Sequence, residues 1–184
     1  MFLSGRNNQF KFEFPRTFIP SEIGDKYKSY LNRLPAGLIK DPISYFNYGI
    51  QSINFPGPSF DPVSQNDFPG NTRKYRSSIP TQELYDKTFT VTFKAFDGWV
   101  NYWLAFELYN YYYSLPGNKP HLPEGIGIQF IDGEGNILVT AKLSQMIMSS
   151  ITPLNLNFSS NTIEFETFDI EFNYNILDIE LNLI

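Results

Sequence analysis

The alternation of apolar and polar residues is clearest over residues 87–95, where phenylalanine, valine and alanine occupy every second position. The positions between them carry Thr88, Thr90, Thr92 and Lys94. A period of two residues predicts a β-strand with one buried face. Because the other face is mostly threonine, it suits a half-covered surface or the wall of a pore as well as open water.

The next segment, residues 99–113, predicts a helix, because it contains neither proline nor glycine and follows Asp97, a good N-cap residue. Five apolar residues can share one face of this helix: Val100, Trp103, Leu104, Leu108 and Tyr111. Five aromatic residues point in other directions: Trp99, Tyr102, Phe106, Tyr109 and Tyr113. A helix that is apolar most of the way round is usually buried on more than one side. We therefore predict that the second group contacts an adjacent subunit.

Shorter alternating runs predict further strands at residues 10–14, 48–55, 126–130, 137–147, 154–158 and 162–174. Residues 176–184 either continue as a strand or pack on the sheet. The apolar phase changes within 48–55 and again near Glu166, which indicates a β-bulge at each place. Residues 132–136 have the composition of a hairpin loop, and residues 149–153 are expected to interrupt the strands. A short helix is expected within residues 21–34.

Connections from strand to strand outnumber strand–helix–strand connections, so the predicted fold class is mainly β. We expect an antiparallel β sandwich or half-barrel with one flanking α-helix. With 184 residues, the chain is expected to form a single domain over 1–184. Two long insertions, at about residues 15–46 and 56–80, leave the sheet, and the second is expected to be an extended loop. Loops of this length are usually functional or interfacial.

Composition narrows the classes of partner. The chain has 14 basic and 19 acidic residues, a net charge of −5, which argues against general nucleic-acid binding through the outer surface. It has no cysteine, which fits a reducing cytosol. Neither a signal peptide nor a membrane-spanning segment is expected. Aromatic residues make up 17% of the chain, and this fits a β-rich core and an oligomer interface equally well.

Candidate chemistry is sparse, and we predict no catalytic, cofactor-binding or metal-binding residue. His121, the only histidine, lies between prolines with no nucleophile or carboxylate motif nearby, so a catalytic triad is not indicated. Metal sites usually need several histidine or cysteine ligands. Residues 132–136 contain two acids but lack the ligand order of a calcium loop, so a hairpin turn is the better interpretation. The chain is therefore not expected to be an enzyme.

Two alternatives from other functional classes stay open. Glu164, Glu166, Asp169 and Glu171 lie on the polar side of alternating strands. Such a row is usually a solvated face, although paired carboxylates also catalyse glycoside hydrolysis. Residues 111–113 are three consecutive tyrosines, which could grip a carbohydrate or a receptor if they were exposed.

The order of segments over residues 9–178 resembles the tail-tube proteins of tailed bacteriophages and the tube proteins of contractile injection systems. The segments that carry this resemblance, in order, are Phe10-Lys-Phe-Glu-Phe14, Ile50-Gln-Ser-Ile-Asn-Phe-Pro-Gly57, residues 89–97 running into a helix with Trp103, residues 128–136, Ile151-Thr-Pro-Leu154, Thr162-Ile-Glu-Phe165 and residues 168–174. The insertions at 15–46 and 56–80 are longer than this pattern leads one to expect.

The resemblance implies a structural virion protein of a phage tail, assembled in the host cytoplasm. Copies would close into a ring, a hexamer in this family, whose inner sheets form one barrel, and rings would stack into a conduit for DNA ejection or cap it. The implied partners are the chain itself, neighbouring tube, hub, baseplate or sheath proteins, and passing DNA without specific binding, with no membrane and no cofactor. A tail hub or baseplate adaptor ring is the alternative within the family. Candidates for the lumen are Thr88, Thr90, Thr92, Glu164, Glu166, Asp169 and Glu171.

Overall fold

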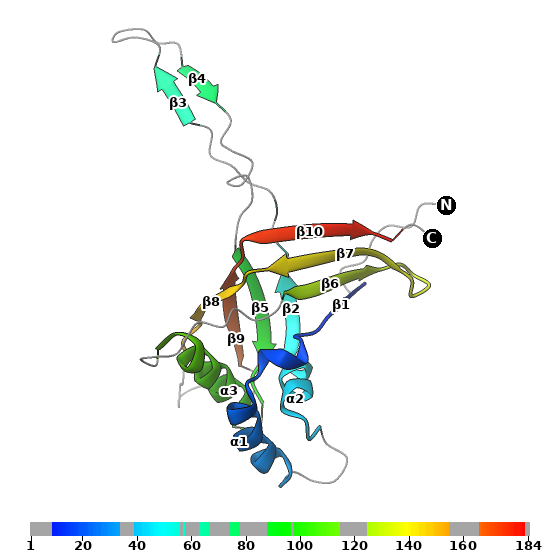
Figure 1. Cartoon of the computed structure of the whole chain (residues 1–184), viewed down its shortest axis with the longest axis vertical. Coiled ribbons are helices and arrows are strands. Elements are labelled where there is room, and N and C mark those ends of the chain that lie inside the picture. The colour runs from blue at the N-terminus through cyan, green and yellow to red at the C-terminus, as the bar shows by residue number, and fades with distance from the viewer. Residues whose placement is uncertain are drawn as a thin grey trace, which may run out of the picture.

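The computed structural model contains two four-stranded antiparallel sheets whose strands run across one another (Figure 1). It describes residues 9–33, 39–55, 57, 63–66, 74–77, 88–96, 98–114, 125–154 and 166–182. Sheet A has the order β1 (Phe10–Phe12), β6 (Ile126–Ile131), β7 (Ile137–Ser144), β10 (Ile176–Leu181). Sheet B has the order β2 (Ile50–Asn54), β5 (Thr88–Lys94), β9 (Thr167–Asn173), β8 (Ile147–Ile151). The predicted mainly-β, antiparallel class is confirmed.

Helices gather at one end of the two sheets (Figure 1). They are η1 (Arg16–Phe18), α1 (Ser21–Leu31), α2 (Pro42–Tyr48), α3 (Val100–Tyr109) and the π-helical turn η3 (Asn110–Ser114). The sequence predicted α1 and α3 but missed α2, which takes Tyr48 out of the expected second strand. The signal for α2 was local: Asp41 accepts from the backbone N–H of Ser44, and Pro42 occupies the first helical turn.

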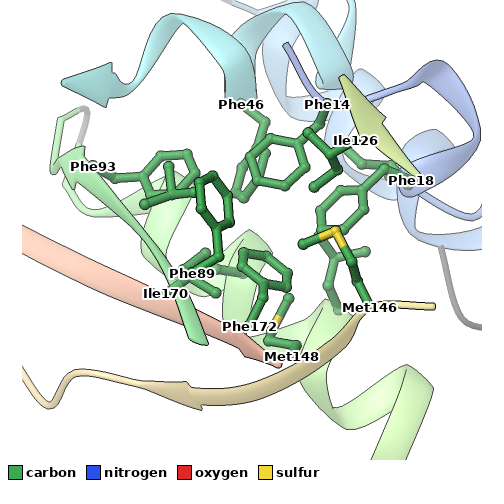
Figure 2. Close-up of a cluster of buried hydrophobic side chains, with 14 of the residues drawn as sticks. Phe14, Phe18, Phe46, Phe89, Phe93, Ile126, Met146, Met148, Ile170 and Phe172 are labelled. Atoms are coloured by element: carbon green, nitrogen blue, oxygen red, sulfur yellow. The ribbon is translucent and has the colours of Figure 1, made fainter. Parts of the chain in front are cut away.

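A cluster of phenylalanines fills the space between the sheets and the helices (Figure 2). The ring of Phe14 lies 4.5 Å from that of Phe18, 5.5 Å from Phe46 and 5.7 Å from Phe172, measured between centroids. Met146 and Met148 line the same space, and flexible thioethers suit the irregular gaps between rings. Alternation along each strand thus delivers one apolar face per sheet to a shared aromatic core.

The register explains one phase change that the sequence contains. The pairing of β2 with β5 shifts between Ile50 and Ser52, so the predicted bulge in this strand is confirmed. The hairpin between β6 and β7 is also confirmed. Its Asp132 carboxylate accepts from the backbone N–H groups of Glu134 and Asn136 at 2.8 Å, and from the side-chain amide of Asn136. These bonds lower the pKa of Asp132, the largest contribution being the Asn136 side chain.

Two predictions about the segment after this hairpin were wrong. The expected single strand over 137–147 is divided at Gln145, which has a left-handed φ of 55°, and the chain passes there from sheet A to sheet B. Strand β8 then covers Ile147–Ile151, where an interruption over 149–153 was expected. The turn at Gln145 contains no glycine or proline, so the alternation of apolar and polar residues continues across the change of sheet.

The prediction that residues 56–80 form an extended loop is wrong for two short segments. Strands β3 (Val63–Asn66) and β4 (Lys74–Ser77) pair in an antiparallel hairpin, with Val63 opposite Ser77. Figure 1 shows this hairpin standing away from both sheets. Several predictions lie outside the described residues: the cap at Asp97, the loop with His121, the strand at 154–158 beyond Leu154, the position of Glu164, and the bulge near Glu166, which depends on residues 163 and 165.

Candidate functional site

The threonine row and the acidic row, which the sequence predicts on separate strands, lie side by side. Strands β5 and β9 are paired so that Thr90 is opposite Glu171 and Thr92 is opposite Asp169. Residues directly opposite each other in an antiparallel pair project to the same side of the sheet. The alternate pair, Val91 with Ile170, is fully buried in the core. The two rows therefore form one surface on the side of sheet B that faces away from the core.

The outer strands extend this surface. Ser52 and Asn54 of β2 are opposite Thr92 and Thr90, and Ser150 of β8 is opposite Glu171. We call the whole surface the polar face; its described members are Ser52, Asn54, Thr88, Thr90, Thr92, Lys94, Ile147, Ser150, Thr167, Asp169, Glu171 and Asn173. Ile147, 41% exposed, is the one apolar side chain among them. A sheet face with so little apolar surface is adapted to water rather than to packing.

The charge of the polar face is acidic. The described members of the face include two acids, Asp169 and Glu171, and one base, Lys94. Glu166 is exposed just before β9 begins. Glu171 is held in place because the Ser149 hydroxyl, at the β8 bulge, donates to its carboxylate at 3.1 Å and to its backbone carbonyl at 3.0 Å. Hydroxyls and carboxylates on a flat sheet can hold water and repel a polyanion.

Within the described part of the chain both edges of sheet B are open: no strand pairs with the outer edge of β2 or with that of β8. A strand edge without a partner strand offers backbone N–H and C=O groups to another chain, although on β8 the N–H of Met148 already donates to the hydroxyl of Tyr113. The polar face is therefore bounded on both sides by edges that can accept another chain.

The predicted subunit-interface residues, in α3 and directly before and after it, divide into two kinds. Trp99, Tyr102, Tyr109 and Tyr113 are half-buried against their own core; the ring of Tyr102, for example, lies edge-on to Phe168 at 5.2 Å. Phe106 is 42% exposed. The interface role of the five stays a prediction, and four of them already have apolar partners within the chain.

The predicted core face of the helix was partly wrong. Leu104 and Leu108 are fully buried, but the buried face also includes Asn101, Ala105 and Tyr112. Trp103, expected inside, is 50% exposed and lines a shallow pocket with Lys26, Tyr27, Tyr30 and Val100. Lys26 of α1 also forms an ion pair with Glu107 of α3. The buried face is displaced by about one residue from the expected one, because a helix with apolar residues on several sides does not determine from its sequence which side packs on the core.

Asn101 is a structural residue that the sequence analysis missed. Its side chain is fully buried, donates to the backbone carbonyl of Lys94 at 2.7 Å and accepts from the N–H of Phe96 at 3.3 Å. A Cβ on Gly49 would lie 3.0 Å from the Asn101 amide nitrogen, so glycine permits this close approach. An asparagine flanked by apolar helix residues was the available signal. The side chain of Asn101 fixes α3 to the end of β5, beside the polar face.

The three consecutive tyrosines are not an exposed platform. Tyr112 is only 5% exposed, its hydroxyl donates to the carbonyl of Phe18 at 2.9 Å, and burial raises its pKa to about 12. The hydroxyl of Tyr113 accepts from the N–H of Met148 at 3.0 Å. Burial also raises the pKa of Tyr113. Tyr112 thus lacks the exposure that the alternative binding function requires. The segment instead joins α3 to η1 and β8.

The described part of the chain contains no group of three or more histidine, cysteine or acidic side chains placed to hold a metal ion. None of its helices is both long and apolar enough to cross a membrane. Asp169 and Glu171 lie two residues apart on the same side of one strand, which differs from carboxylates facing each other across a groove.

No protein-family model and no curated protein sequence matches the chain. Solved structures with a similar fold include a chain of the anti-feeding prophage baseplate, with 11% identity and a TM-score of 0.49, covering 72% of this chain and 80% of that one. A chain of the sheath–tube complex of an extracellular contractile injection system has 18% identity and a TM-score of 0.46, covering 72% and 81%. An Hcp protein has 13% identity and a TM-score of 0.37, covering 94% and 97%.

Proposed function

We propose that this chain is a structural, non-enzymatic subunit of a phage-type tail, and that its copies close into a ring with the polar face of sheet B turned inward. The observation that carries the proposal is the combination of that face with two open edges. A polar face on a two-sheet fold is ordinary by itself. When its sheet is also open on both sides, sheet-to-sheet pairing between copies extends the same face into a continuous wall.

The strand order makes such a ring geometrically consistent. All neighbouring strands in sheet B are antiparallel, so β8 runs opposite to β2. Copies related by rotation about one axis keep a common strand direction. The β8 edge of one copy would therefore meet the β2 edge of the next in an antiparallel pair. Every junction between copies would be the same, so all neighbouring strands around the ring would be antiparallel. Closure also removes every free edge of this sheet.

The inner wall of the ring would be lined by Thr88, Thr90, Thr92, Asp169 and Glu171, with Glu166 at one rim. Carboxylates along the wall repel DNA phosphates, so DNA would pass without binding. Rings would stack into a tail tube, or one ring would serve as a hub or baseplate adaptor. The order of sequence segments supports the tail assignment. The long segments 15–46 and 56–80 would make the contacts to the next ring or to another tail protein.

The first test is the size of the purified protein. Sedimentation velocity over a range of concentrations should detect an assembly of several copies, and negative-stain microscopy should show rings or tubes about 100 Å wide, from the dimensions of a domain of this length. A folded monomer at every concentration, with no rings, would contradict the proposal.

The second test asks which surface lines the hole. The chain has no cysteine, so single cysteines can be placed at Thr92 on the polar face and, as the control, at Leu138 on the outer side of sheet A, which is 43% exposed. A maleimide coupled to a polymer too bulky for the channel should react with both thiols in dissociated protein. In tubes it should react only with the Leu138→Cys variant. Equal reaction of both variants in tubes would show that the polar face is not the lumen.

A further inference from the structure

The inner face of sheet A is covered over only part of its length. On β7, Leu143 and Ala141 are buried to 0% and 1% exposure, whereas Val139, nearer the β6–β7 hairpin, is half-buried. On β6, Ile126 and Ile128 are buried and Phe130 is half-buried. Burial therefore decreases steadily toward the hairpin end of the sheet.

The decrease is greatest on β10. Ile179 is opposite Ala141 and Leu181 is opposite Val139, so both project to the same side as the core. They are nevertheless 60% and 66% exposed. We call the uncovered part of this face the overhang and define it by Phe10, Phe130, Val139, Ile179 and Leu181. Its members occupy adjacent positions on all four strands, so they form one continuous apolar surface.

The overhang lies beside the open edge of β2. Figure 1 shows β6 and β7 continuing past β2 toward their hairpin. Phe55, which follows β2, packs edge-on against Phe130 of the overhang, with ring centroids 5.6 Å apart. A strand added to the outer edge of β2 would therefore extend sheet B beneath the uncovered face of sheet A.

We propose that the overhang is a docking surface for the β8 edge of a second copy of this chain. The inference rests on the proposed ring and specifies what holds it together. In each junction β8 of one copy pairs with β2 of the next, and its inward side chains, chiefly the half-buried Ile151, pack under Ile179, Leu181 and Val139. The two-layer core then continues across the subunit boundary.

A second copy fits this surface because β8 has both of the properties that the site requires. Among the described residues no strand pairs with its outer edge, and the edge of β2 needs such a strand as its partner. The two sides of β8 also match the two sides of sheet B: Met148 and Ile151 project toward the core, while Ser150 projects to the polar face. Added to β2, it presents apolar groups to the overhang and leaves the polar face unbroken.

The first experiment compares two matched variants of the full chain. Ile179→Asp with Leu181→Asp places charges in the overhang, while Leu138→Asp places one on the opposite side of the same sheet. Side chains that are already mostly in water should alter the monomer little, so its circular dichroism should be unchanged. The concentration needed for assembly should rise at least about tenfold for the overhang variant, from the apolar burial that two such side chains lose. It should stay within about twofold for the control. Assembly of both variants like the wild type would overturn the proposal.

The second experiment joins the two surfaces covalently. A copy carrying only Leu181→Cys is mixed with a copy carrying only Ile151→Cys, and a short bismaleimide is added. Dimers of the mixed pair should form in far higher yield than with Leu138→Cys in place of Leu181→Cys. Equal yields from the two mixtures would overturn the proposal.

These results separate the inference from the proposed function. Rings that form normally without the Leu181–Ile151 link would overturn the inference and leave the ring intact. The specific link in the absence of any ring would support the docking surface and contradict the ring. A monomer with no link at all would overturn both.

Discussion

Strands β9 and β10 are alike in sequence and differ in what surrounds them. In β9 the apolar residues Phe168, Ile170 and Phe172 alternate with acids and polar residues, and all three are buried to 1% exposure or less. In β10 the residues Leu177, Ile179 and Leu181 alternate with Asp178 and Glu180 in the same way. Only Leu177 is half-buried, and the other two are mostly exposed.

The difference comes from position within the sheets. Strand β9 is central in sheet B, with β5 and β8 on either side and sheet A and α3 over its inner face. Strand β10 is at the edge of sheet A, and its far end extends beyond the cover that sheet B provides. Alternation thus identifies which side of a strand is apolar, but not whether another layer covers that side. Exposed apolar alternation on an edge strand is therefore an indication of a missing partner.

The largest loss of stability is expected for a substitution on the covered inner side of β9. Phe172→Ala should destabilise the monomer by about 3–5 kcal/mol, because it removes a buried ring that contacts Phe14 and Phe89. Urea unfolding followed by far-ultraviolet circular dichroism measures this loss. A change below about 1 kcal/mol would mean that the aromatic core is far looser than the contacts in Figure 2 indicate.

Alkaline pH should weaken the same covered region. Burial raises the pKa of Tyr112 to about 12 from its ordinary value of 10.0, so the neutral phenol is favoured in the folded chain. Its contribution is complete below about pH 10 and is lost as the pH rises from about 10 to about 12, up to about 3 kcal/mol. Unfolding free energies measured across this range should fall. They should fall less steeply for Tyr112→Phe, and identical slopes would contradict the assignment to Tyr112.

A smaller loss of stability is expected where Asn101 connects α3 to sheet B. Asn101→Ala should cost about 1–3 kcal/mol, because the carbonyl of Lys94 and the N–H of Phe96 lose their partner in a buried place. Asn110→Ala, at the C-terminal end of α3, is a control in a half-buried position. Thermal unfolding of the two variants gives the comparison, and equal melting temperatures would show that the Asn101 bonds contribute little.

The smallest effect is expected on β10. Ile179→Ala should change the stability of the monomer by no more than about 0.5 kcal/mol, because its side chain is mostly in water already. The same urea titration as for Phe172→Ala measures it, at a concentration below that of assembly. A loss comparable to that of Phe172→Ala would mean that β10 is covered in solution, and the contrast between the two strands would disappear.

Local patterns predicted much of the fold. Regular alternation was sufficient for β5, β6 and β9, and the phase change within residues 48–55 was sufficient for the bulge at β2. For residues 176–184 the sequence left two possibilities, and the structure forms the strand β10 there. The failures have local causes. At Gln145 a left-handed residue turns the chain into another sheet without a glycine, and at Pro42 a short helix begins where no long apolar period supports it. The sequence showed the candidate site as two separate rows, one of threonines and one of acids. It could not show that they lie side by side, because the pairing of strands joins residues that are far apart in the chain.

The amino-acid sequence by itself determined the strands β5, β6 and β9, the apolar side of each, and that one helix carries aromatic residues in several directions. These are local consequences of side-chain periodicity. Only the tertiary structure decided that Thr90 and Glu171 share a face, that Asn101 joins the helix to the sheet, and that Ile179 and Leu181 lie uncovered on the core side. Those facts depend on strand order and on the extent of one sheet over another, which residues far apart in the chain decide together.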